Sequence, residues 1–559
     1  AAPAAPATAP TDSPSIISSL DIVSDYIPLG MQMSTCAKGL FEDCLHMVRF
    51  GRSENIFLKF DVPGAQPQGS FRIRLDSRLA EKELAVLTAA EETNWLTLPT
   101  EELPLGSSKL VAEYLSAGGE VLYSIESDIV IGNLTAAFDA VHLNRADSSV
   151  YGTINLYADD HLPGLSINME TMLVELVWDK TSRDYIEKLY PDVVATELEL
   201  DLPPGGYQLP FDIPMPEKEG LWKVVFQIEV FPDIGLVTAN ESQIFQNYSP
   251  PSWQPGEPYT IAVFPDTQYF SERYPHIFTR MVEWVAQNAA ERNIELLLHM
   301  GDITDDNSPD QWKRAQTSLK LLNGFIPYAL AVGNHDMATG GGNVSRRGLT
   351  LLNNYFSKSD FSGLAGTFAE NRLENSYHLF EIGGTEYLVV SLEFCPPEEV
   401  VAWANEVIAQ HPTRKVILIT HSYTTKDGYP AAAGASASSY NLGSNPDTTM
   451  VEGVDMWRKL VKNHENFFMV LSGHRYSPTI PRRIAHGDAG NKVYEFLVDF
   501  QSEPNGGDGW FVLMEFRPDG NIYVDTYSPY LDEYKRTVDR YGYNCHFLID
   551  TERGAFIVP

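Results

Sequence analysis

The pattern of apolar and polar residues changes once along the chain, near residue 250. Before that point, short segments alternate apolar and polar residues and are separated by Gly, Pro and Asn. In segment 222–231, apolar side chains at every second position predict a strand with one buried face and one exposed face. Strands that follow one another without helices are typical of antiparallel sandwiches. We therefore predict two immunoglobulin-like β-sandwiches, at residues 15–137 and 138–247.

A Pro-rich linker is predicted at residues 248–258, and the pattern after it is different. Buried strands such as 259–264 and 294–300 now alternate with segments in which apolar residues recur at helical spacing. The expected helices are 275–293, 309–324, 398–410 and 451–464. This alternation predicts parallel strands joined by helical crossovers, and with the later strands it predicts an α/β/β/α sandwich at residues 259–559. A segment rich in Ala, Ser and Gly, 424–450, is expected to form a mobile loop over a site.

Composition narrows the possible functions. The chain has 75 acidic and 40 basic residues, a formal net charge of −35, which argues against sequence-independent binding of nucleic acid. The sequence contains no uninterrupted apolar stretch of about 18 residues, the length that a membrane-spanning helix needs. Residues 1–14 are rich in Ala and Pro and are expected to form a flexible leader, as in a processed exported protein. We therefore expect a secreted, periplasmic or cell-surface location.

Five of the expected buried strands are followed directly by residues that bind metals. The carboxyl ends of parallel strands share one edge of a sheet, where functional groups gather. The residues concerned are Asp266, Gln268, Asp302, Asn334, His335, Asp336, His421 and His474. A mixture of Asp, Asn and His ligands favours Zn, Mn or Fe over Ca or Mg. The sequence therefore predicts a transition-metal site at this edge.

These blocks read DTQ, GD, GNHD, H and GHRY in chain order. They resemble the pattern of the calcineurin-like metallophosphoesterase superfamily, D-x-H, G-D, G-N-H-[DE], H and G-H-x-H, over residues 259–530. The resemblance implies two divalent metal ions, bridged by Asp302, that activate water for in-line attack on a phosphate ester. It also implies Asn334, His421 and His474 as the other ligands of the second ion, and Asp266 as a ligand of the first.

Two positions depart from the family's pattern. Gln268 stands where the family has a His ligand, and Tyr476 stands where the pattern ends in His. Both changes fall on the first metal, so we expect its ion to be bound more weakly than the second. A branch of the family with secreted bacterial members also reads PDTQ and carries a segment similar to DFQSEPNGGDGW (499–510), so these changes are compatible with activity.

The resemblance also assigns roles beyond the metals. His335 matches the histidine that stabilises or protonates the leaving oxygen, and Asp336 is expected to orient it. Arg475, Tyr476 and Gln501 are expected to contact the substrate.

These features predict a secreted metallophosphoesterase that hydrolyses phosphate mono- or diesters with a metal-activated water. The long β-rich half and the two lost ligands support an alternative, a surface, assembly or carbohydrate-binding protein with a degenerate phosphoesterase domain. The expected partners are a phosphate ester and, through the β domains, a glycan or a cell surface.

Overall fold

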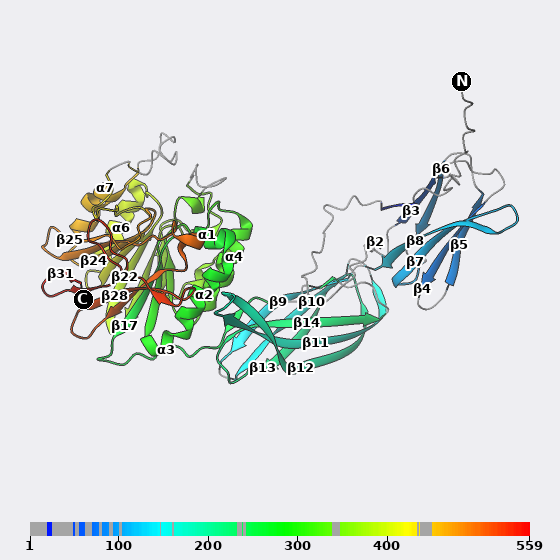
Figure 1. The fold of residues 1–559 in the computed structure, drawn as a ribbon, viewed down its shortest axis with the longest axis horizontal. Coiled ribbons are helices and arrows are strands. Elements are labelled where there is room, and N and C mark those ends of the chain that lie inside the picture. Colours follow the sequence, from blue (N-terminus) through cyan, green and yellow to red (C-terminus); the bar gives the residue numbers. More distant parts are fainter. Residues whose placement is uncertain are drawn as a thin grey trace, which may run out of the picture. The chain divides into compact units, whose positions relative to one another are not determined.

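The computed structural model divides the chain into two compact units (Figure 1). The first comprises residues 1–174, 189–216 and 223–243, and the second comprises 175–188, 217–222 and 244–559. The described residues are 103–558, except 133, 146, 159–160, 232–236, 239–241, 338–346, 433–434 and 436–449, together with six strands before residue 103. The predicted leader at 1–14 and most of the predicted loop at 424–450 lie outside the described residues.

Strands dominate residues 20–246. Three sheets are ordered β1-β3-β6, β2-β8-β7-β4-β5 and β13-β10-β9-β15, and a fourth sheet is ordered β12-β11-β14-β16. This half of the chain is rich in strands, as predicted, whereas the immunoglobulin-like topology and the division at residue 137 stay predictions. The strands are β1 (Leu20–Ser24), β2 (Val48–Phe50), β3 (Asn55–Asp61), β4 (Ser70–Ser77), β5 (Glu81–Thr88), β6 (Thr93–Pro99), β7 (Gly106–Leu115), β8 (Val121–Ile131), β9 (Leu134–Asn144), β10 (Ser149–Ala158), β11 (Leu162–Asp179), β12 (Asp184–Leu202), β13 (Gly205–Pro214), β14 (Leu221–Phe231), β15 (Val237–Thr238) and β16 (Phe245–Gln246).

Two mixed sheets form the frame of the second unit. One is ordered β19-β18-β17-β27-β28-β30-β31, with β29 paired to β28, and the other is ordered β20-β21-β22-β23-β24-β26-β25. The strands of the first sheet are β17 (Tyr259–Phe264), β18 (Ile294–His299), β19 (Tyr328–Leu330), β27 (Phe511–Phe516), β28 (Ile522–Ser528), β29 (Glu533–Tyr534), β30 (Phe547–Asp550) and β31 (Ala555–Ile557). Those of the second are β20 (Leu364–Thr367), β21 (Ser376–Ile382), β22 (Thr385–Leu392), β23 (Lys415–Thr420), β24 (Phe467–Ser472), β25 (Arg482–His486) and β26 (Lys492–Leu497).

The two sheets and the helices on their outer faces form four layers, held together by three apolar clusters. The central cluster joins alternate residues of both sheets, among them Val263, Leu298, Ile417 and Leu471. The other faces of the sheets pack against helices, α2 and α4 on one side and α6 and α7 on the other. Because each sheet is covered on both faces, its strands are apolar on both faces, and β17 is buried at every residue. The predicted α/β/β/α arrangement of this unit is confirmed.

The helix expected at 398–410 matches α6, whereas the other three expected helices are shorter than the sequence pattern predicted. The helices are α1 (Gln268–Arg273), α2 (Pro275–Gln287), α3 (Ala289–Arg292), α4 (Pro309–Leu319), α5 (Leu352–Tyr355), α6 (Glu398–Gln410), α7 (Gly453–Lys459) and α8 (Pro504–Gly507). The helix expected at 275–293 breaks at Asn288, and the one expected at 309–324 ends in a 3-10 turn at Lys320–Leu322 before Gly324, whose φ is +65°. No helix in the described part of the chain is long and apolar enough to cross a membrane.

A buried carboxylate in the second unit fastens the β11–β12 turn to α2. Glu283 is only 4% exposed and accepts hydrogen bonds from the hydroxyl groups of Tyr185, at 2.6 Å, and Tyr248, at 2.9 Å. The guanidinium of Arg280 donates to the same carboxylate at 2.8 Å. Each oxygen of Glu283 is therefore paired, and three segments distant in sequence depend on one side chain.

We expect the substitution Glu283→Ala to lower the free energy of unfolding of the second unit by about 3 kcal/mol, because it leaves a buried cation and two buried hydroxyl groups without their acceptor. Urea denaturation followed by tryptophan fluorescence measures this change. Glu291→Ala, on an exposed position of α3, is the control and should change the free energy by less than about 0.5 kcal/mol. Equal losses in the two variants would contradict the prediction.

Candidate metal centre and active site

The predicted ligand positions lie at one edge, where the ends of the two sheets meet. Asp266 follows β17 and Asp302 follows β18 of the first sheet, and His421 follows β23 and His474 follows β24 of the second. The His421 ring lies with Nδ1 2.9 Å from the carbonyl oxygen of Met300. The backbone N–H of His474 donates to both carboxylate oxygens of Asp266, at 3.3 and 3.1 Å. Contacts between the sheets thus bring these residues together, as the sequence predicted.

Four of the side chains form a compact group around His421. Ligand atoms of Asp302, His421 and His474 all lie within 4.8 Å of one another. Nε2 of His421 is 3.0 Å from Oδ2 of Asp302 and 3.1 Å from Oδ1 of Asn334. Nδ1 donates its proton to the Met300 carbonyl, so Nε2 is the ring atom that faces these two oxygens. A cation between these three atoms would satisfy all of them.

The electrostatics of this group also favour a positive charge. Burial alone opposes protonation of His421, but the Asp302 carboxylate raises the pKa of His421 above its ordinary value. Burial and the neighbouring His421 lower the pKa of His474 well below its ordinary value, so that its imidazole is neutral and free to act as a ligand. The residues predicted for the second metal therefore fit a divalent cation.

The residues predicted for the first metal lie beside this group. Asp266 and Gln268 are each only 1% exposed. Nε2 of Gln268 donates to Oδ1 of Asp305 at 3.2 Å, and Oε1 of Gln268 is buried without a hydrogen-bond partner among the described residues. A buried amide oxygen without a donor costs about 1–3 kcal/mol, and a cation would remove this cost. Gln268 is thus oriented as a metal ligand would be.

Four buried carboxylates surround the site: Asp266, Asp302, Asp336 and Asp499, each no more than 1% exposed. Burial, then the charges of Asp499 and Asp302, raise the pKa of Asp266 well above its ordinary value. Burial and the charge of Asp302 raise the pKa of Asp336 to about 6. The negative charges thus oppose one another's ionisation, and bound cations would relieve this repulsion. The donor set fits two divalent ions.

His335 lies next to this centre and is held by Asp305. Its ring Nδ1 is 2.5 Å from the backbone carbonyl oxygen of Asp305 and 3.1 Å from Oδ1 of the same residue. Its backbone N–H donates to Oδ1 of Asp302 at 2.9 Å. Burial would lower the pKa of His335, but Asp302 and Asp305 together raise it to about 9. The imidazole is therefore held beside the metal centre, and its raised pKa favours the protonated form that can donate a proton.

The prediction that Asp336 orients His335 is wrong. The Asp336 carboxylate instead accepts backbone N–H groups of Gly333, Ile303 and Thr304 at 2.9, 3.1 and 2.8 Å, and the Thr304 hydroxyl at 3.0 Å. His335 and Asp336 begin the 3-10 turn His335–Met337, in which successive side chains point in different directions. Asp336 therefore ties two ligand-bearing loops together, and Asp305 orients His335.

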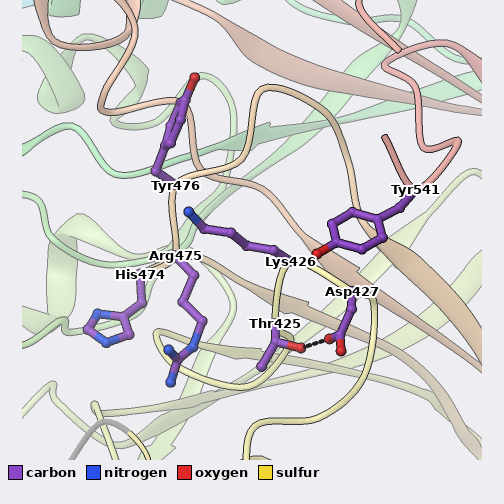
Figure 2. A pocket seen from close by; sticks show the side chains of 7 residues that line it. All are labelled: Thr425, Lys426, Asp427, His474, Arg475, Tyr476 and Tyr541. Atoms are coloured by element: carbon purple, nitrogen blue, oxygen red, sulfur yellow. Dashed lines mark hydrogen bonds between the residues drawn. The ribbon is translucent and has the colours of Figure 1, made fainter. Parts of the chain in front are cut away.

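Two of the predicted substrate-binding residues line an open cavity beside the metal centre (Figure 2). The cavity has a volume of about 520 Å³ and is lined by Thr425, Lys426, Asp427, His474, Arg475, Tyr476 and Tyr541. Nζ of Lys426 lies 5.4 Å from the centre of the Tyr476 ring, and Arg475 pairs with the buried Glu452 at 3.3 Å. The Tyr476 hydroxyl donates to Glu503 at 3.3 Å. Tyr476 and Arg475 are thus placed to contact a substrate.

Gln501, the third predicted substrate contact, lies elsewhere. It is not among the residues that line this cavity, and its backbone N–H and its Nε2 donate to the two carboxylate oxygens of Asp499, at 2.9 and 3.1 Å. Neither Asp499 nor Asp305 was predicted as a site residue from the sequence. The position of Asp499 in the sequence could have indicated a site residue, because it follows the buried strand β26 by two residues, as His474 follows β24. Nothing local distinguished Asp305 from an exposed loop residue.

Two glycines leave room for the ligands. A Cβ atom on Gly333 would lie 2.1 Å from Oδ1 of Asp302, and a Cβ on Gly473 would lie 2.1 Å from Oδ1 of Asp266. Both glycines have backbone angles that other residues adopt, so space alone requires glycine here. Asp302 itself has a φ of +49° and follows Gly301 at +92°. The backbone thus bends sharply where the central carboxylate leaves β18.

Comparisons with known proteins agree with this geometry. Residues 259–478 match the model of a family described as calcineurin-like phosphoesterase. A protein of Bacillus subtilis (strain 168), described as uncharacterized protein YvnB, is 31% identical over 317 residues. That match covers 55% of this chain and 23% of the other protein, so the chain spans about a quarter of the length of this curated relative.

Three solved structures are similar to parts of the chain at low identity and low TM-score. Red sea bream transglutaminase is 10% identical, with a TM-score of 0.20, over 34% of this chain and 29% of that chain. A Salmonella alpha-2-macroglobulin mutant is 10% identical, with a TM-score of 0.16, over 44% and 19%. A tetra-tandem repeat in the extending region of a large adhesion protein is 15% identical, with a TM-score of 0.17, over 39% and 50%. Scores this low carry no argument about fold or function.

We expect Gly333→Ala to weaken metal binding at least tenfold, because the added methyl group must displace the Asp302 carboxylate or its backbone. Titration calorimetry with Mn²⁺ measures the affinity. Gly206→Ala serves as the matched control, since its Cβ would meet nothing closer than 3.9 Å, and its affinity should equal that of the unmodified chain. Unchanged affinity in Gly333→Ala would show that Asp302 does not bind the ion.

Proposed function

Since residues 259–478 belong to the calcineurin-like phosphoesterase superfamily, we propose that this protein hydrolyses phosphate mono- or diesters with the help of two divalent metal ions. The observation that carries the proposal is the group of Asp302, Asn334 and His421, in which Nε2 of His421 lies 3.0 Å from Oδ2 of Asp302 and 3.1 Å from Oδ1 of Asn334. A buried carboxylate, an amide oxygen and an imidazole nitrogen at these distances can share one divalent cation.

The residues divide into two sets of ligands. Asp302, Asn334, His421 and His474 would hold the second ion, and Asp266 and Gln268 would hold the first, with Asp302 shared between both. Two such ions supply an activated water and neutralise the charge of the phosphate. The imidazole and carboxylate donors favour Zn, Mn or Fe.

His335 acts on the leaving group in this proposal. Its ring is oriented through Nδ1 by Asp305, which leaves Nε2 as the proton-donating atom. Donation of this proton to the leaving oxygen avoids the release of an alkoxide, and a general acid of this kind contributes about 10²- to 10⁴-fold in rate.

The cavity beside His474 accommodates the organic part of the ester. Its volume of about 520 Å³ lies in the range of small-molecule sites. Lys426 brings a positive charge to the cavity of a strongly acidic protein, and Tyr476 and Tyr541 offer aromatic faces (Figure 2). This lining suits a phosphate ester that carries a further anionic or planar group. An extracytoplasmic location and a glycan contact through the β-rich half remain separate proposals.

The purified chain with Mn²⁺ or Zn²⁺ should hydrolyse nitrophenyl phosphate mono- or diesters, and a chelator should abolish this activity. Asp302→Asn should lose bound metal together with activity, because an amide replaces the shared carboxylate. His335→Ala should keep its metal content but lose about 10²-fold or more in kcat. Metal analysis and steady-state kinetics check these outcomes. A chain that binds no metal and has no turnover would favour the alternative of a degenerate phosphoesterase domain.

Lys426→Met should raise KM about 3- to 30-fold and change kcat little, since it removes a charge that binds the substrate before and during reaction. The methionine keeps the apolar stem that packs near Tyr476. Lys313→Met, on an exposed position of α4, is the matched control and should leave KM unchanged. Equal KM values for the unmodified chain and Lys426→Met would remove Lys426 from the substrate site.

A further inference from the structure

The first metal lacks one ligand at the place where Tyr476 stands. The Tyr476 hydroxyl is directed to Glu503, at 3.3 Å, so this side chain does not turn toward Asp266. We propose that the carboxylate of Asp499 takes the place of the missing histidine and binds the first metal ion. This inference rests on the proposed two-metal site and adds a ligand that the sequence motifs do not contain.

The pairing of two parallel strands places Asp499 at the site. Ser472 of β24 is paired with Leu497 of β26, and the backbone N–H of Val498 donates to Ser472 at 2.8 Å. His474 follows Ser472 by two residues and Asp499 follows Leu497 by two, so both emerge at the same edge. The backbone of His474 contacts Asp266. Asp499 therefore leaves its strand beside His474, whose backbone N–H contacts the first-metal carboxylate.

The turn that carries Tyr476 closes over Asp499. The backbone N–H of Ser477 donates to the carbonyl oxygen of Asp499 at 2.9 Å. Ser477 follows Tyr476 directly, so this hydrogen bond fixes the backbone of Asp499 beside the residue that replaces the family's histidine.

The bonding of Asp499 leaves room for a metal. Its carboxylate is fully buried, and no ion pair with a cationic side chain is formed among the described residues. Both oxygens accept hydrogen bonds from Gln501, at 2.9 and 3.1 Å, which leaves lone pairs on each oxygen. A carboxylate buried without a cation is strongly unfavourable. Gln501 holds Asp499 in one orientation, as the outer partners of metal ligands do.

A second observation points to the same ion. Oε1 of Gln268 is buried without a hydrogen-bond partner among the described residues, although Gln268 is only 1% exposed. The segment after Asp499 packs against the helix that Gln268 begins, because a Cβ on Gly506 would lie 2.5 Å from Cβ of Tyr269. Five consecutive residues, 505–509, have positive φ and form a tight left-handed turn that permits this approach. The segment that begins with Asp499 therefore also packs against the helix that begins with Gln268, so both candidate ligands of the first ion depend on it.

Metal content tests the assignment independently of activity. The full chain is stripped of metal, reconstituted with Mn²⁺ and analysed by mass spectrometry of the metal and by electron paramagnetic resonance. The unmodified chain should hold two ions with a spin-coupled signal. Asp499→Asn, which keeps the size of the side chain, should hold one ion with the signal of an isolated Mn²⁺. Glu503→Gln removes a charge from the same segment but should keep both ions.

Two further variants distinguish the loss of a metal ligand from misfolding of the chain. Asp499→Glu keeps the carboxylate but moves it by one methylene, and should weaken the first site at least tenfold. Tyr476→His combined with Asp499→Asn should regain the ion of the first site, because the histidine restores the family's ligand there. Two ions bound with unchanged affinity in both Asp499→Asn and Asp499→Glu would overturn the proposal. Fewer than two ions in the unmodified chain would instead overturn the proposed two-metal function, so the two failures are distinguishable.

Discussion

The burial of negative charge at the meeting edge of two sheets is the constraint on which the second unit depends. Asp266, Asp302, Asp336 and Asp499 are all withdrawn from water within one site. Such a cluster is unstable unless hydrogen-bond donors and cations compensate it. The Asp336 carboxylate is compensated by backbone N–H groups and a hydroxyl, and Asp302 partly by His421. The remaining charge defines a place for metal ions.

The surrounding fold serves to hold these charges together. Apolar strands covered on both faces fix the positions of the strand ends, and the central cluster fixes one sheet against the other. Gly333 and Gly473 then allow a neighbouring carboxylate to approach the backbone within a distance that no other residue permits. Asp336 links the loops after β18 and β19, so that Asp302 and His335 keep their separation. Rigidity of this kind is what a metal centre requires of its protein.

The two departures from the family's motifs have a common structural setting. Gln268 and Tyr476 lie near the same segment, 499–510. This segment packs against α1 and is hydrogen-bonded to the turn that follows His474. A change at one ligand position is thus accompanied by a buried carboxylate from a strand that the motifs do not include. If Asp499 binds the first ion as proposed, the number of metal-binding groups matches that of the family while their chemical types differ.

The sequence by itself determined the order of strands and helices in the second unit and the strand ends where most of the candidate metal-binding residues lie. Both follow from local rules: apolar periodicity, and polar residues placed directly after buried strands. The tertiary structure alone decided three pairings. Asp305 contacts the His335 ring, Asp336 hydrogen-bonds to two loops, and Gln501 donates hydrogen bonds to Asp499. Side-chain direction within a tight turn and the register between distant strands decide such pairings. Both depend on packing across the whole unit, and no local pattern of residues encodes them.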